Sequence, residues 1–114
     1  FLFAAPFAVR MGLPLVLARK KGKLPGKTLS KTFELEYGSA EIEIHSSDIK
    51  KGDRILIVDD LIATGGTLKA VCELLSEAGA DVAGIFGVIG LPFLGYGDKL
   101  KGVQVTTLID YNSE

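Results

Sequence analysis

The chain has 114 residues, of which 47% are hydrophobic and 24% are charged. These proportions are typical of one folded globular domain, here residues 1–114, and they exclude a disordered or membrane-embedded chain. Thirteen basic residues are balanced by fourteen acidic ones, so the net charge of -1 gives no electrostatic reason to expect nucleic acid or a membrane as a partner.

The first element that we predict is a core helix over Phe1 to Leu13. Pro6 is tolerable near its first turn, and Gly12 is a stop signal. The segment lacks the basic start of a secretory leader and is shorter than the roughly 20 residues that span a bilayer. Because the chain does not begin with Met, we expect it to be a processed piece, a fragment or the ordered part of something longer.

A buried strand is predicted next, over Pro14 to Ala18, with the basic residues Arg19, Lys20 and Lys21 following its C-terminal end. Three cations at the end of a strand could hold a phosphate, because charge-assisted contacts to phosphate are strong. A solvated basic turn is the alternative that the isolated sequence favours.

Residues 22–45 are predicted to form a flap. Gly22 to Ser30 contains two glycines and a proline and should be a mobile loop. The alternating patterns of Lys31 to Glu36 and Ala40 to Ile44 predict two strands of a hairpin. A lid of this kind could keep water away from a reacting sugar carbon, and a purely structural hairpin is the alternative.

The stretch from Arg54 to Thr67, RILIVDDLIATGGT, carries most of the chemistry. Ile55 to Val58 is an unbroken aliphatic run, which predicts a central parallel strand that is buried on both faces and ends at the acid pair Asp59–Asp60. A helix over about Thr67 to Ala78 should follow a short loop, and Gly79 should end it.

The loop before this helix has the composition of a phosphate site. Backbone N–H groups from Thr64 to Thr67 would form an anion cradle at the positive end of the helix dipole, and the two glycines allow close approach. The nearby carboxylates Asp59 and Asp60 would repel a phosphate unless the same ligand offers them hydroxyl groups or a cation. A ribose 5-phosphate offers hydroxyl groups to the carboxylates and a phosphate to the cradle, so we predict a ribose-phosphate site.

Other phosphate-binding loops do not fit the spacing. A nucleoside-triphosphate loop needs a Lys after its last glycine, whereas Gly66 is followed by Thr67. A dinucleotide fingerprint needs three spaced glycines directly after the strand, where this chain has Asp59 and Asp60. A polar turn that binds nothing is the remaining alternative.

The histidine, the cysteine and the possible metal ligands also bear on the chemistry. His45, the only histidine, has no nucleophile or second His at partner spacing and is interpreted as structural. The single cysteine, Cys72, lies on a predicted buried helix face, which suits a reducing cytosol and an unreactive thiol. No Cys/His cluster for zinc is present, so any metal should be Mg²⁺ held by the ligand's phosphates, with water-mediated help from Asp59 or Asp60.

The last part of the chain completes the fold. Val82 to Ile89 predicts another buried strand, a helical turn is expected around Asp98 to Leu100, and Val103 to Ile109 should be an edge strand. The order of elements predicts an α/β fold with a mostly parallel twisted sheet, flanking helices and a β-hairpin flap.

These motifs resemble a known family. The RILIVDDLIATGGT stretch is similar to the phosphoribosyl-pyrophosphate motif of type I phosphoribosyltransferases, and KGKLPG, LEYG and EIH are similar to the adenine phosphoribosyltransferases among them. The resemblance runs from Phe1 to about Tyr111. It implies a cytoplasmic, homodimeric enzyme of purine salvage that joins adenine to phosphoribosyl pyrophosphate and gives AMP and pyrophosphate.

The resemblance also implies roles for residues. Arg19 would bind pyrophosphate and Leu91 would pack against the purine, while Glu36 would share a proton with the base and Tyr37 would close over the site. The expected site residues are Arg19, Glu36, Tyr37, Asp59, Asp60, Ala63, Thr64, Gly65, Gly66, Thr67 and Leu91.

One part of the family's pattern has no counterpart in this sequence: an Ala-Arg-Gly turn that holds pyrophosphate, the strand before it and a small N-terminal hood. Two alternatives to an active enzyme therefore stay open. The chain could be a module that senses the sugar phosphate without catalysis, or an inactive fragment of the enzyme.

Overall fold

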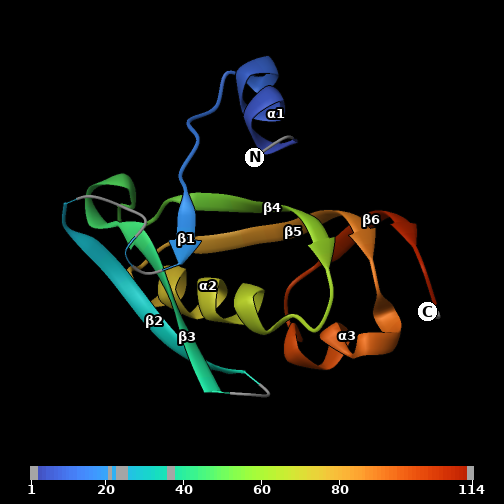
Figure 1. Cartoon of the computed structure of the whole chain (residues 1–114). Coiled ribbons are helices and arrows are strands. Elements are labelled where there is room, and N and C mark those ends of the chain that lie inside the picture. The colour runs from blue at the N-terminus through green and yellow to red at the C-terminus, as the bar shows by residue number, and fades with distance from the viewer. Residues whose placement is uncertain (1–2, 21, 23–25, 36–37, 113–114) are drawn as a thin grey trace. The chain divides into compact units, whose positions relative to one another are not determined.

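The computed structural model describes residues 3–20, 22, 26–35 and 38–112. The chain divides into two compact units, each made of segments that are separate in the sequence. Unit 1 comprises Phe1–Leu15, Ile55–Gly65 and Val82–Glu114, and unit 2 comprises Val16–Arg54 and Gly66–Asp81. Figure 1 labels the helices and strands of both.

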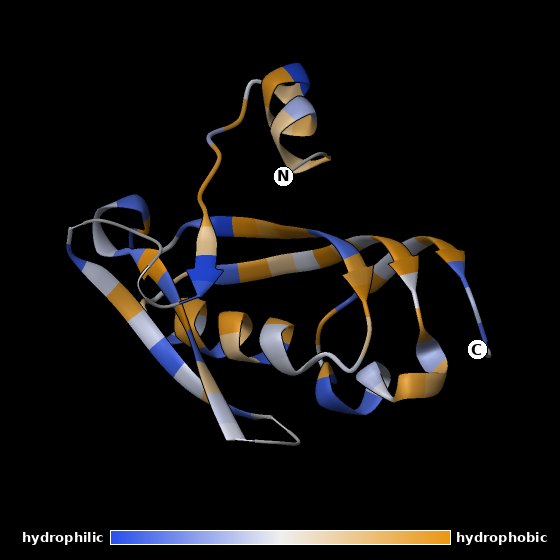
Figure 2. Ribbon diagram, in the orientation of Figure 1, coloured by the Kyte–Doolittle hydropathy of each residue, from blue (hydrophilic) through white to orange (hydrophobic). Residues whose placement is uncertain are grey.

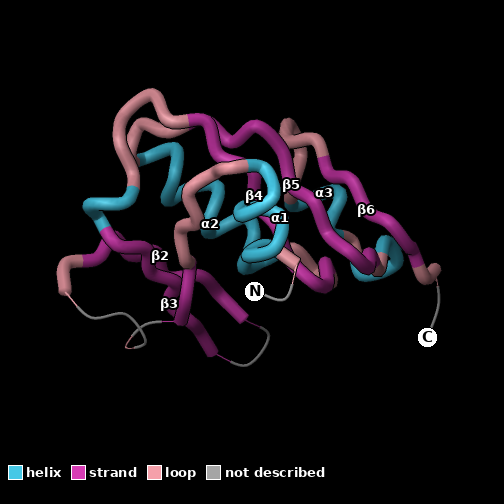
Figure 3. The backbone as a smooth tube through the Cα atoms, turned by 90° about the horizontal axis from the view of Figure 1, so that it is seen from above, coloured by secondary structure: helices cyan, strands magenta, loops and turns pink. Residues whose placement is uncertain are grey.

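Unit 1 is built on a three-stranded sheet. Its strands are β4 (Arg54–Ile62), β5 (Asp81–Gly90) and β6 (Val105–Asp110), in the order β4-β5-β6. β5 and β6 are parallel, with Ile85 opposite Val105, and they run side by side in Figure 3. The predicted parallel sheet and the edge position of β6 are confirmed.

β4 differs from its prediction in three respects. It continues beyond Val58 to Ile62, so Asp59–Asp60 lies within the strand and not after it. In the described sheet β4 is an edge strand and β5 lies in the middle. Leu56 and Leu61 are 45% and 47% exposed, so β4 is not buried on both faces. An aliphatic run indicates a strand but does not reveal its place in a sheet.

Helix α1 (Ala4–Met11) belongs to unit 1 and ends as predicted. Pro6 lies in its first turn, and Gly12 closes it with φ 67°. The expectation of a core helix is wrong: Ala8 is its buried residue, whereas Val9 is 82% exposed. Phe7 and Met11 of α1 are also exposed, at 42% and 59%, because a helix can turn only part of its circumference toward one neighbour. Figure 2 shows hydrophobic residues in both turns of α1. No helix of the described chain is long and apolar enough to cross a bilayer.

Two short helical segments follow β5 in unit 1. They are the 3-10 helix η2 (Pro92–Leu94) and the α-helix α3 (Tyr96–Lys99). The predicted helical turn around Asp98 therefore forms slightly earlier in the chain than expected. Ile62 and Ile85 are among the fully buried side chains of the structure and mark the core of this unit.

Unit 2 contains a second three-stranded sheet, and all of its pairings are antiparallel. Its strands are β1 (Ala18–Lys20), β2 (Thr28–Leu35) and β3 (Gly38–His45), in the order β1-β3-β2. The predicted hairpin is therefore confirmed as β2 and β3. The 3-10 turn η1 (Ser46–Asp48) follows β3.

The bounds of two strands in unit 2 were predicted incorrectly. The strand expected over Pro14 to Ala18 forms instead over Ala18–Lys20, because the residues that pair with β3 begin at Ala18. Arg19 therefore lies within a strand and not after it. Thr28 to Ser30, expected in a mobile loop, belongs to β2 because these residues pair with the end of β3.

Helix α2 (Gly66–Glu77) packs against β2 and β3 in unit 2. Gly79 ends it as predicted, with φ 85° and an N–H that donates to Ser76 O at 3.0 Å. Lys31 of β2 also reaches α2, where its Nζ lies 3.4 Å from Glu73 Oε2 and 2.5 Å from Glu77 Oε1. The buried residues of α2 are Leu68, Ala70, Val71, Leu74 and Leu75.

Candidate functional site

The candidate site is the loop that connects β4 to α2. β4 ends at Ile62 and α2 begins at Gly66, one residue earlier than predicted, so the expected order of strand, loop and helix is confirmed. Thr64 and Thr67 are exposed, whereas Gly65 between them is buried. The two threonines, one before and one after the buried glycine, are thus both accessible to a ligand.

Gly65 must be glycine for two independent reasons. Its φ of +87° lies in the left-handed region, which L side chains rarely adopt. A Cβ at this position would also lie 3.0 Å from Tyr96 Cβ and 3.5 Å from Leu100 Cδ1. The tight bend of the loop therefore depends on close packing against α3 and the residue after it, which the sequence did not indicate.

The start of α2 favours an anion. The first N–H groups of any α-helix have no partner within the helix, and they lie at the positive end of its dipole. The first turn of α2 contains no acidic residue to compete for them. With glycine at position 66 and an exposed threonine at position 67, a phosphate could approach these donors closely.

The two acidic residues at the end of β4 have different surroundings. Asp60 is exposed, and its backbone N–H donates to Asp59 Oδ1 at 2.8 Å. Asp59 is partly buried, and this burial raises the pKa of its carboxyl group. The neighbouring charge of Asp60 raises the pKa further, while the hydrogen bond from Asp60 opposes the rise.

Leu91 lies beside the start of the loop. Its N–H donates to Ile62 O at 2.9 Å, which joins the residue after β5 to the last residue of β4. Its side chain is half-buried. The structure thus brings together Asp59, Asp60, the loop and Leu91 at the carboxyl ends of two neighbouring strands, where α/β sheets commonly bind ligands.

The remaining predicted site residues lie elsewhere or are not described. Arg19 lies in β1 in unit 2, where it pairs across the sheet with Glu43. Glu36 and Tyr37 fall outside the described residues. Within the described ranges no group of three or more His, Cys, Asp or Glu residues is arranged to hold a metal ion.

The histidine and the cysteine have structural surroundings. His45 Nδ1 lies 4.0 Å from Asp48 Oδ2, and its Nε2 is buried without a hydrogen-bond partner in the described structure. Cys72 is half-buried, and burial, assisted by the charge of Glu73, raises the pKa of its thiol. A raised pKa lowers the fraction of thiolate, which is the nucleophilic form of a cysteine.

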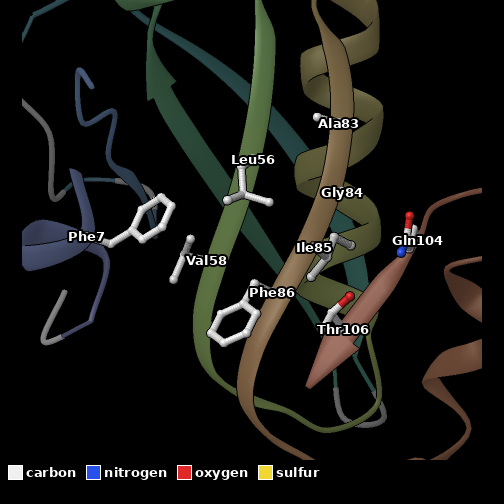
Figure 4. A pocket seen from close by; sticks show the side chains of 9 residues that line it. All are labelled: Phe7, Leu56, Val58, Ala83, Gly84, Ile85, Phe86, Gln104 and Thr106. Atoms are coloured by element: carbon white, nitrogen blue, oxygen red, sulfur yellow. The ribbon is translucent and has the colours of Figure 1, made fainter. Parts of the chain in front are cut away.

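Unit 1 also contains an apolar pocket of about 350 Å³. Figure 4 shows Phe7 of α1 directed toward Val58 on the face of the sheet. Its walls contain no charged side chain, so it does not suit a sugar phosphate. The lining residues are Phe7, Leu56, Val58, Ala83, Gly84, Ile85, Phe86, Gln104 and Thr106.

Comparison with known proteins identifies the family. The family model of the phosphoribosyl transferase domain matches residues 1–105. The chain belongs to this family. Among curated relatives, the adenine phosphoribosyltransferase of Treponema denticola is 58% identical over 114 residues, which are 100% of this chain and 60% of the relative. The phosphoribosyl transferase domain described here therefore spans about 60% of the length of that relative.

Solved structures of the family agree with the fold. The adenine phosphoribosyltransferase of Thermoanaerobacter pseudethanolicus superposes with a TM-score of 0.94 at 46% identity, covering 97% of this chain and 64% of that one. The enzyme of Saccharomyces cerevisiae, solved with an imino-altritol bisphosphate and adenine, gives a TM-score of 0.89 at 42% identity, covering 95% of this chain and 61% of that one. The α/β fold of a type I phosphoribosyltransferase is thereby confirmed.

Proposed function

We propose that this chain carries the phosphoribosyl-pyrophosphate site of an adenine phosphoribosyltransferase, which joins adenine to phosphoribosyl pyrophosphate and releases pyrophosphate with AMP. The observation that carries the proposal is the β4–α2 loop, in which a buried, left-handed Gly65 is flanked by exposed Thr64 and Thr67 directly before an acid-free helix start. The relatives named above carry this activity in their names.

The loop would hold the 5-phosphate. Ala63 to Thr67 would supply backbone N–H donors, and the threonine hydroxyl groups would add two more. A phosphate at this place needs no buried cation from the protein, because the helix dipole and several N–H donors share its charge.

The acid pair would bind the ribose. Carboxylates of Asp59 and Asp60 accept hydrogen bonds from sugar hydroxyl groups, and charge-assisted hydrogen bonds of this kind are stronger than neutral ones. Leu91, beside the loop, would pack against the purine, and Arg19 would bind the pyrophosphate. Glu36 and Tyr37 would act near the base as the flap closes. The reaction then depends on the orientation of the two reactants and on stabilisation of the charge that is distributed over the transition state. No covalent intermediate with the protein is needed.

Magnesium fits the oxygen donors of this site. Mg²⁺ prefers carboxylate, phosphate and water ligands and keeps several waters. Since the described residues include no group of three suitable ligands, the ion would be held mainly by the phosphates of the substrate, with Asp59 or Asp60 contacting it through water. When bound, it would neutralise charge on the leaving pyrophosphate.

A homodimeric, cytoplasmic protein completes the proposal. The exposed apolar side chains of Val9 and Met11 on α1, 82% and 59% exposed, would be suited to burial by a second copy. The single cysteine, half-buried Cys72, is compatible with a reducing compartment. Sedimentation of the chain over a range of concentrations tests the dimer.

The experiment that tests the activity measures the formation of AMP from labelled adenine and phosphoribosyl pyrophosphate in the presence of Mg²⁺. We expect Asp60→Asn to lower turnover by more than about tenfold, the effect of losing one charge-assisted contact of roughly 1.5–3 kcal/mol. Asp98→Asn, which changes an exposed acid of α3 outside the site, should leave turnover unchanged.

Two results would count against the proposal. Equal turnover of the Asp60→Asn variant and the unchanged chain would show that the acid pair takes no part in the reaction. Binding of phosphoribosyl pyrophosphate without any AMP formation, in this chain and in a form lengthened to match its relatives, would favour a sensing module.

A further inference from the structure

Glu43 is a buried carboxylate to which the proposed reaction assigns no role. It is 5% exposed and is a buried charged residue of the described structure. It lies in β3, the middle strand of the sheet in unit 2, where the alternating sequence predicts a solvent-facing side chain. Burying a carboxylate is costly unless hydrogen bonds compensate it, so its partners indicate what it does.

The two oxygens of this carboxylate accept hydrogen bonds from the two ends of the connection between β1 and β2. The N–H of Gly22, shortly after β1, donates to Oε1 at 3.1 Å. The hydroxyl of Thr28, the first residue of β2, donates to Oε2 at 3.4 Å. Glu43 thus joins the residues that leave β1 and enter β2 to the strand between them.

The residues that lead into β2 are also hydrogen-bonded to the residue that follows β3. The N–H of Ser46, directly after β3, donates to Lys27 O at 3.2 Å. The positions of Lys27 and Thr28 are thereby fixed by a backbone contact and a side-chain contact, and Gly22 is held by the hydrogen bond from its N–H to Glu43.

One basic residue of β1, Arg19, lies opposite Glu43 in the sheet. Arg19 is the register partner of Glu43, so their side chains extend from the same face of the sheet. Only two residues separate Arg19 from Gly22 along the chain. Fixing Gly22 therefore restricts the backbone that carries Arg19 and Lys20.

We propose that Glu43 is a positioning residue for anion binding: it holds Gly22 and Thr28 so that Arg19 of β1 is placed to receive a pyrophosphate group. This rests on the proposed function of Arg19. A carboxylate suits the task because both of its oxygens are acceptors, whereas an amide would offer a donor at one of the two places. Glu43 acts through Gly22 and Thr28 and does not touch the ligand, which its negative charge would repel.

The test compares four variants of the full chain. Glu43→Gln keeps the shape of the side chain but replaces one acceptor by a donor, and Thr28→Val removes the hydroxyl from the other side. The matched controls are Glu41→Gln, on the same strand and face, whose carboxylate accepts from Thr32 instead, and Thr28→Ser, which keeps a hydroxyl. Thermal unfolding first establishes that each variant is folded.

Two measurements are then made: hydrogen exchange of the Gly22 amide by NMR, and the affinity for inorganic pyrophosphate by titration calorimetry. We expect Glu43→Gln to speed Gly22 exchange and to weaken pyrophosphate binding by about tenfold each, the scale of one hydrogen bond to a charged group. Thr28→Val should weaken binding in the same direction, and both controls should match the unchanged chain.

Unchanged pyrophosphate affinity in folded Glu43→Gln would overturn the proposal, as would equal weakening in Glu41→Gln. Absence of pyrophosphate binding by the unchanged chain would also overturn it. Pyrophosphate binding needs no adenine and no turnover, so the AMP assay reports separately on the proposed function. If the Glu43→Gln variant forms AMP normally but its pyrophosphate affinity is unchanged, the proposed function stands and the role proposed for Glu43 is wrong.

Discussion

Ile62 occupies the space that a side chain on Gly87 would need. A Cβ on Gly87 would lie 2.5 Å from Ile62 Cδ1 and 2.6 Å from Cγ1. These residues belong to neighbouring strands, β4 and β5, and Ile62 is 0% exposed. Ile62 is also the last residue of β4 and accepts a hydrogen bond from Leu91, so this contact lies at the junction between the strand and the candidate loop.

The first prediction follows from that contact. Gly87→Ala should destabilise the chain by roughly 1–3 kcal/mol, the usual cost of forcing extra atoms into a packed core. Gly97→Ala is the matched control, because a Cβ there meets nothing within 4 Å and its φ is not positive. Urea unfolding measures both. Equal stabilities of the two variants would show that Ile62 can move aside without cost.

The second prediction separates strain from packing in the candidate loop. Gly65→Ala should destabilise the chain more than Gly102→Ala, although both residues have a φ near +85°. Backbone strain of about 1 kcal/mol is common to both variants, but only at Gly65 does the new Cβ meet a neighbour, Tyr96 Cβ at 3.0 Å. Urea midpoints give the difference. A larger loss for Gly102→Ala would contradict the packing described for the loop.

The third prediction concerns the pH dependence that Asp59 gives to stability. Burial raises the pKa of its carboxyl group above the ordinary value of 3.8, so the folded chain holds this proton more tightly than the unfolded chain. Ionisation of Asp59 therefore lowers stability as pH rises from 3.8 through the raised pKa. Asp59→Asn should melt at a higher temperature than the unchanged chain at pH 7.

The advantage of Asp59→Asn should shrink as pH is lowered from the raised pKa toward 3.8, because the carboxyl group of the folded chain is then protonated. Asparagine retains an oxygen for the hydrogen bond from Asp60 N–H, so that contact is kept. Thermal melts between pH 4 and 7 provide the measurement. An advantage that grows toward acid pH would reverse the assigned direction of the shift.

The fourth prediction concerns the attachment of the hairpin to α2 in unit 2. Hydrogen bonding to Glu77 raises the pKa of Lys31, with a further contribution from Glu73. The ion pairs should therefore stabilise the fold at pH below the ordinary value of 10.5 and should be lost as pH rises through the raised pKa. Lys31→Gln should lower the melting temperature slightly at pH 7.

Salt provides the check on this effect. Exposed ion pairs are screened at high ionic strength, so the difference between Lys31→Gln and the unchanged chain should become smaller in 1 M salt. Lys101→Gln, which changes an exposed lysine of unit 1, serves as the reference. A difference that is independent of salt would indicate that the stem of Lys31 contributes through packing.

The sequence predicted the types of the elements better than their surroundings. The aliphatic run before Asp59 indicated a strand, and the glycine pair before Thr67 indicated a helix start, because both signals are local. The edge position of β4 and the exposure of Leu56 depend on which strands pair. Such pairing depends on residues distant in the chain and leaves no local pattern.

The candidate site shows the same division. The threonines and glycines of the loop were recognised from their order, but the packing of Tyr96 against Gly65 was not, since a tyrosine in a short turn carries no such signal. Glu43 was missed for a different reason. Strand alternation with Ile42 and Ile44 predicts an outward, solvated side chain, whereas hydrogen-bond donors from Gly22 and Thr28 allow it to be buried.

The interleaving of the two units has a practical consequence for dissecting this protein. The chain passes from one unit to the other between residues 15 and 16, 54 and 55, 65 and 66, and 81 and 82. No single cut can release either unit as an uninterrupted polypeptide. Recombinant expression of one half would thus require splicing distant segments with artificial joins, and one of the natural crossings falls between the paired glycines of the candidate loop.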